Sequence, residues 1–210
     1  MTRFNTLALA ALAAGCAFDN GPARDVPLGT ASDAVAGFAT DLGWQVTLTD
    51  ARLYVPHVEF LDGDEAWVGE LAGGDAIDLL AASQDLGQAI FQPGSQALEA
   101  LVRVGPPETG QAASMHSAGL YLAGSAVPPG GGDPVDFTAA LPIDADVVVA
   151  DLALAADDLG ALTLEIHSGG WLDGIDFSTL PGGAIVAGST AAAALEAKLA
   201  DGSLDVTTGD

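Results

Sequence analysis

The sequence is poor in cysteine and in basic residues, and each shortage excludes a class of function. Its 210 residues contain one cysteine, Cys16, so the chain can form no internal disulfide and no zinc site made of cysteine ligands. Only 5 Lys and Arg residues accompany 29 Asp and Glu residues, which gives a formal net charge of -24. So few cations cannot neutralise a phosphate backbone, and we expect no nucleic-acid partner.

Sequence signatures of catalysis are also missing. The chain has no Gly-x-Ser-x-Gly elbow and no Gly-rich phosphate loop leading into a helix. Ser168 follows His167 directly, and adjacency in sequence is no evidence for a catalytic triad. The many carboxylates are interpreted as a solvated surface that attracts cations or suits a salty exterior, because no EF-hand pattern is present. We therefore predict that the protein is not an enzyme.

The N-terminal segment resembles a bacterial lipoprotein signal. Leu7–Ala14 is apolar and is followed by the small residue Gly15 and by Cys16. In lipoprotein signals the cysteine at this position is the residue that becomes acylated. Eight residues make a helix of about 12 Å, which cannot cross a hydrocarbon core of about 30 Å. An ordinary secreted protein with a cysteine near its cleavage site is the alternative. Ala17, rather than Asp, after the cysteine favours the outer membrane of a Gram-negative cell.

These features predict three parts of the chain. Residues 1–15 form a lipoprotein signal peptide, and residues 16–30 form a lipidated N-terminus and tether, with Cys16 as the lipid anchor in a bilayer. Residues 31–210 form one acidic domain.

Short apolar runs separated by Gly, Pro and Asp predict an all-β domain, an antiparallel β-sandwich of about 8–9 strands. Asp62-Gly63 lies between apolar runs and predicts a hairpin whose turn residues take positive φ. Around Pro56-His57 the alternation of apolar residues changes parity, which predicts a β-bulge. The Ala-rich segment Thr190–Ala200 predicts a short C-terminal helix that Ser189 or Thr190 can cap.

Three histidines are candidate metal ligands: His57, His116 and His167. Imidazole suits copper or zinc, but these residues have no local ligand spacing, and ordinary surface or structural roles are the alternative. Strand parity places His116 toward the core and His167 on the outer face beside Glu165. Trp44, Trp67 and Trp171 could stack on a sugar, although Trp44 and Trp67 occupy strand positions that favour core packing.

Segments Leu48–Val55, Asp75–Leu80 and Leu164–Phe177 resemble parts of the methanobactin-associated, MbnP-like periplasmic proteins. The resemblance implies a β-sandwich in the cell envelope, and copper binding through histidines and a modified tryptophan. In this chain only His167 and Trp171 could correspond to such copper-binding residues. The chain lacks the cysteines found near the end of typical members.

Two hypotheses for function follow. The first is a membrane-anchored envelope lipoprotein that acts as a non-catalytic binding or structural module for an envelope protein or a glycan. The second is a periplasmic metal-binding protein of copper type that uses His57, His116 and His167. The metal hypothesis requires the histidine donor atoms to converge at one rim of the fold.

Overall fold

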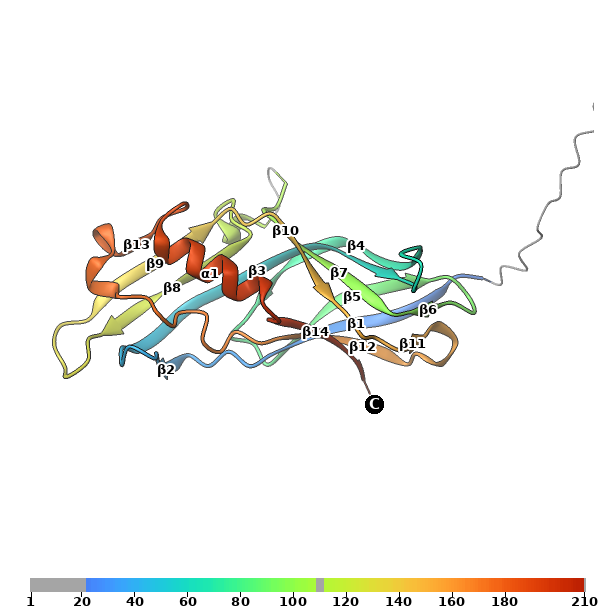
Figure 1. The fold of residues 1–210 in the computed structure, drawn as a ribbon, viewed down its shortest axis with the longest axis horizontal. Coiled ribbons are helices and arrows are strands. Elements are labelled where there is room, and N and C mark those ends of the chain that lie inside the picture. The colour runs from blue at the N-terminus through green and yellow to red at the C-terminus, as the bar shows by residue number, and fades with distance from the viewer. Residues whose placement is uncertain (1–21, 109–111, 210) are drawn as a thin grey trace, which may run out of the picture.

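The computed structural model describes residues 22–108 and 112–209, which are mostly β-structure with one short helix (Figure 1). The strands are β1 (Arg24–Ser32), β2 (Gly37–Ala39), β3 (Gln45–Leu61), β4 (Trp67–Asp78), β5 (Ser83–Phe91), β6 (Gln96–Ala97), β7 (Glu99–Val104), β8 (Leu120–Val127), β9 (Val135–Leu141), β10 (Ala145–Val149), β11 (Leu154–Ala155), β12 (Ala161–Ile166), β13 (Ala184–Ile185) and β14 (Leu204–Gly209). The helix is α1 (Thr190–Ala200). The prediction of a β-rich chain with a short C-terminal helix is confirmed.

The sheet is mixed, so the predicted purely antiparallel arrangement is wrong. Within the described residues, 12 strands form one sheet whose main path is β13-β9-β8-β3-β4-β5-β1-β12-β14, and β6 pairs with β11 separately. β1 runs parallel to β12, and β13 runs parallel to β9. These parallel partners lie far apart in the chain, where no hairpin turn dictates an antiparallel direction.

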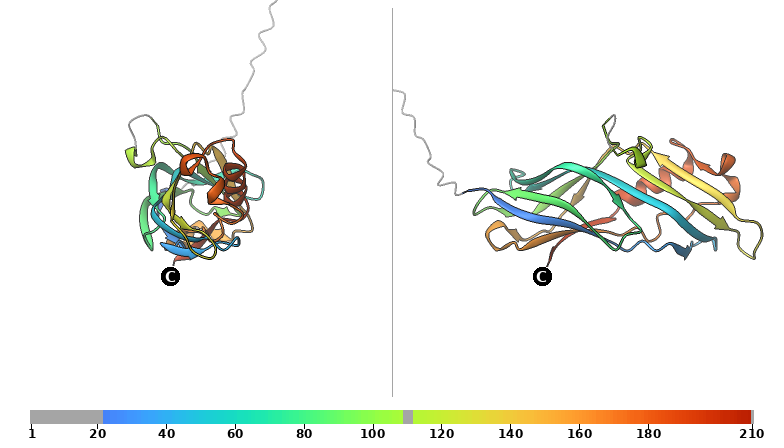
Figure 2. Two further views of the ribbon diagram at one scale, coloured as in Figure 1. Left: turned by 90° about the vertical axis from the view of Figure 1, so that its left-hand side faces the viewer. Right: turned by 180° about the vertical axis from the view of Figure 1, so that it is seen from behind.

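The long strand β3 joins two regions of this sheet. On one edge its first half pairs with β8 and its second half with β7, while β2 and β4 occupy the other edge. β10 extends the sheet beyond β7, and the sheet curls until β10 and β14 come close. Seen end-on in Figure 2, the strands wrap around the apolar core of an elongated molecule.

β1 corrects the predicted start of the domain. Part of the predicted tether, from Arg24 to Thr30, belongs to this strand, and Val26 and Leu28 are buried in the core. Pro27 and Gly29 alternate with these inward residues. Because Pro and Gly are typical of loops, the composition of the segment predicts a tether. Cys16 and the predicted signal peptide, residues 1–15, lie outside the described residues.

β3 contains the bulge that the sequence predicts. Its register with β4 shifts between Val55 and His57, so that residues on both sides of Pro56 face the same core. Gly74 of β4 approaches this bulge so closely that a Cβ there would lie 2.0 Å from the carbonyl oxygen of Val55. The predicted β3–β4 hairpin also forms, but Glu65 is the turn residue with positive φ (59°), and Gly63 is not.

Helix α1 begins where the sequence predicts. The Ser189 side chain accepts a hydrogen bond from the backbone N–H of Ala192 (3.1 Å) and caps the helix. Leu195 and Leu199 are buried, and the helix lies against β10. Among residues 22–108 and 112–209, no helix has the length and apolar character needed to span a membrane.

Candidate functional site

An apolar cavity of about 250 Å³ opens between the segment after β1 and the turn after β12. Strands β3 and β8 supply its floor, with the buried side chains of Leu48, Ala51 and Leu122. Its rim carries Val35 and the carboxylates of Asp33 and Asp173, and Trp171 lines its wall. The three side chains of the floor occupy inward positions of their strands, where the burial of alternate residues places them on one face.

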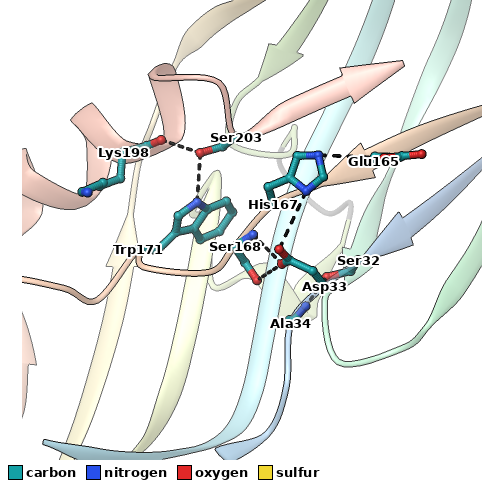
Figure 3. A network of polar contacts seen from close by, with 9 residues as sticks. All are labelled: Ser32, Asp33, Ala34, Glu165, His167, Ser168, Trp171, Lys198 and Ser203. Atoms are coloured by element: carbon teal, nitrogen blue, oxygen red, sulfur yellow. Dashed lines mark hydrogen bonds and ion pairs between the residues drawn. The ribbon is translucent and has the colours of Figure 1, made fainter. Parts of the chain in front are cut away.

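The Trp171 indole is fixed by the C-terminal end of α1. Its Nε1–H donates to Ser203 Oγ at 3.0 Å, and Ser203 Oγ in turn donates to the carbonyl oxygen of Lys198 (Figure 3). The backbone N–H of His167 also donates to the Ser203 carbonyl oxygen (2.8 Å). Trp171 therefore presents a buried, oriented ring to the cavity instead of a mobile one.

Two carboxylate clamps hold the rim together. Asp33 Oδ1 accepts hydrogen bonds from the backbone N–H (2.7 Å) and the hydroxyl (2.9 Å) of Ser168, as Figure 3 shows. At the second clamp, the Asp41 N–H donates to Asp173 Oδ1 (2.9 Å) and the Gly174 N–H donates to Asp41 Oδ1 (2.7 Å). The first clamp ties the segment after β1 to the turn after β12, and the second ties the turn between β2 and β3 to it, so the cavity has a preformed mouth.

His167 lies beside the first clamp, on the outer face that its strand parity predicts. Its Nδ1 is 3.7 Å from Asp33 Oδ2 and its Nε2 is 3.9 Å from Glu165 Oε2. Ser168 Oγ donates to Asp33 rather than to the imidazole, so these residues form no nucleophile–base pair. Their arrangement positions a turn, and we see no acyl-transfer geometry in it.

The other two histidines have separate surroundings. His57 lies between Glu70 (Nε2 to Oε2, 3.3 Å) and Glu59 (Nδ1 to Oε1, 4.0 Å) on β3 and β4. His116 is exposed and stacks on Tyr121 with ring centroids 4.5 Å apart. The predicted core-facing orientation of His116 is wrong, because it follows a 3-10 turn and takes a left-handed backbone conformation with φ 51°.

The residues therefore do not fit a shared copper or zinc site. No group of three or more His, Cys, Asp or Glu side chains could hold a metal ion within the described ranges, 22–108 and 112–209. His57, His116 and His167 each contact different neighbours, and the convergence that the metal hypothesis requires is not found there.

The tryptophans do not form a common sugar-stacking surface. Trp44 is buried and packs edge-on against Phe177 (5.4 Å between centroids), which confirms its predicted core role. Trp67 is 41% exposed, so the core role predicted for it is wrong. The cavity beside Trp171 was missed in the sequence because its walls come from residues more than a hundred positions apart.

Comparison with known proteins adds a weak resemblance. No protein-family model matches the chain, and no curated protein matches it. Among solved structures, MbnP from Methylosinus trichosporium is similar at 13% sequence identity, over 69% of this chain and 75% of that chain, with a TM-score of 0.39. A likeness this low assigns neither the fold nor a function.

Proposed function

We propose that the protein is a non-catalytic binding module of the cell envelope that takes a small apolar ligand into the cavity beside Trp171. The cavity carries this proposal: it is concave, mainly apolar, and bordered by a few fixed polar groups, which is the usual make-up of a small-molecule site. The two clamps support it further, because a mouth that is already ordered loses little entropy on binding.

The proposal includes attachment to a membrane through Cys16. Acylation of Cys16 would place the domain at the outer membrane of a Gram-negative cell, and several acyl chains would hold it there stably. Metabolic labelling with a radioactive fatty acid tests this attachment. Label in the membrane fraction that Cys16→Ser abolishes supports the anchor, whereas an unlabelled wild-type protein rejects it.

Blocking the mouth of the cavity tests the binding function. Val35 is 57% exposed on the rim, and Val186 is a matched control at 53% exposure that does not line the cavity. We expect Val35→Trp to weaken binding of neutral 2-phenylethanol at least about tenfold in calorimetry, a loss of about 1.4 kcal/mol. Val186→Trp is expected to bind like the wild type. No binding by the wild type, or equal binding by both variants, rejects the proposal.

A further inference from the structure

We infer that the natural ligand of this cavity is a small organic cation, an amine with an apolar body of about the size of a phenylethyl group. The inference rests on the proposed binding function and adds the charge and size of the ligand. It draws on the rim chemistry, the distribution of basic side chains and the cavity volume.

The rim is acidic, and the nearby His167, whose Nδ1 is 3.7 Å from Asp33 Oδ2, does not line the cavity. Asp33 and Asp173 line the cavity, and none of the lining residues is Lys, Arg or His. Three arginines are held elsewhere, by backbone carbonyls or by other carboxylates: Arg24, Arg52 and Arg103. An anionic ligand would therefore meet two carboxylates and no basic side chain in the cavity lining, whereas a cation would be attracted by the rim and by the net charge of -24.

Both rim carboxylates are positioned before a ligand arrives and keep acceptor capacity. The clamps hold Asp33 and Asp173 through Oδ1, and an ionised carboxylate offers about four acceptor positions on its two oxygens. An ammonium group has up to three donors and needs such acceptors where it leaves bulk water. The same residues thus shape the mouth and can receive a cationic head group.

The volume sets the size of the apolar body. An apolar cavity of about 150 Å³ takes up benzene. The cavity of about 250 Å³ therefore accommodates an aromatic ring with a short chain, whose amine would reach the rim. The buried Leu48, Leu122 and Trp171 side chains would contact that body.

Three probes of similar size and different charge are compared: 2-phenylethylamine, 2-phenylethanol and phenylacetate, which are cationic, neutral and anionic at neutral pH. Calorimetry at low salt is expected to show the amine binding about tenfold tighter than the alcohol, and no binding of phenylacetate. Added NaCl is expected to narrow the gap between amine and alcohol, because it screens exposed charges.

Variants of the rim complete the test. Asp33→Asn and Asp173→Asn remove charge but retain an oxygen that can accept the clamp hydrogen bonds. Combined, they are expected to bring amine and alcohol affinities within about threefold of each other, a ratio measured within one variant so that any change in the cavity affects both probes alike. Asp136→Asn, at an exposed position of β9 that does not line the cavity, matches the charge change of each single variant and is expected to keep the full preference.

The outcomes distinguish the two proposals. If the wild type binds the alcohol as tightly as the amine, or the preference survives in the double Asn variant, the cation inference is overturned and the binding function stands. If no probe binds, the binding function itself fails.

Discussion

Ser203 connects the cavity wall to the helix through one hydroxyl group. It is buried, accepts from the Trp171 indole N–H and donates to the Lys198 carbonyl. Ser203→Ala leaves the indole N–H without this acceptor, and we expect a loss of about 1–3 kcal/mol in the free energy of unfolding. Urea denaturation followed by tryptophan fluorescence measures it. A midpoint equal to that of the wild type would show that the hydroxyl has no such role.

Gly74 allows two strands to meet at the bulge of β3. A Cβ at this position would overlap the Val55 carbonyl at 2.0 Å, so we expect Gly74→Ala to lower the free energy of unfolding by at least about 2 kcal/mol. Gly160→Ala is the control, because a Cβ there meets nothing within 4 Å, and its effect should stay within about 0.5 kcal/mol. Equal effects in urea denaturation would contradict the close approach.

Ionisation of Tyr54 makes the stability of the fold depend on pH in the alkaline range. Burial raises the pKa of its phenol above 10.0, and the nearby Asp75 and Glu108 charges raise the pKa further. The neutral phenol is favoured in the fold, so its contribution to stability is complete below pH 10 and is lost as the pH rises through the folded-state pKa. The chain has two tyrosines, and Tyr121→Phe isolates Tyr54. We expect its ultraviolet titration to lie above that of the urea-unfolded variant, and coincident curves would contradict this.

At the scale of elements, the helix cap is the simplest device to test. Ser189 accepts from the Ala192 N–H at 3.1 Å, and we expect Ser189→Ala to cost about 0.5–2 kcal/mol of stability. Glu196→Ala, an exposed change within the same helix, should cost much less. The comparison of their urea midpoints checks the cap, and equal midpoints would argue against it.

Elements with local signals could be predicted from the sequence, and those with distant partners could not. Alternation, turn residues and capping revealed most strands, the bulge at Pro56 and the helix Thr190–Ala200. The sequence did not predict strand β14 or the parallel pairing of β1 with β12. Pairing and register between distant segments are set by the packed core and not by local residues. For the same reason the sequence drew attention to Trp171 and His167 but could not reveal the cavity or the Asp33 clamp.

At the scale of the whole molecule, the net charge of -24 makes stability depend on salt. Repulsion between exposed carboxylates opposes the compact state, and ions screen it. We expect the urea midpoint to rise most steeply from about 0.01 to about 0.15 M NaCl, where the Debye length falls from about 30 to about 8 Å. A rise confined to about 1 M and above would point to salt exclusion from the protein surface instead.

The single long strand β3 limits how this protein can be divided or recombined. Its 17 residues belong to both regions of the sheet, and its two halves pair with different neighbours. A cut within β3 would expose unpaired backbone groups on both fragments, and neither fragment would keep a complete core. Gene fusion, fragment complementation or loop grafting in this fold would therefore have to keep β3 intact and exchange only the connections around it.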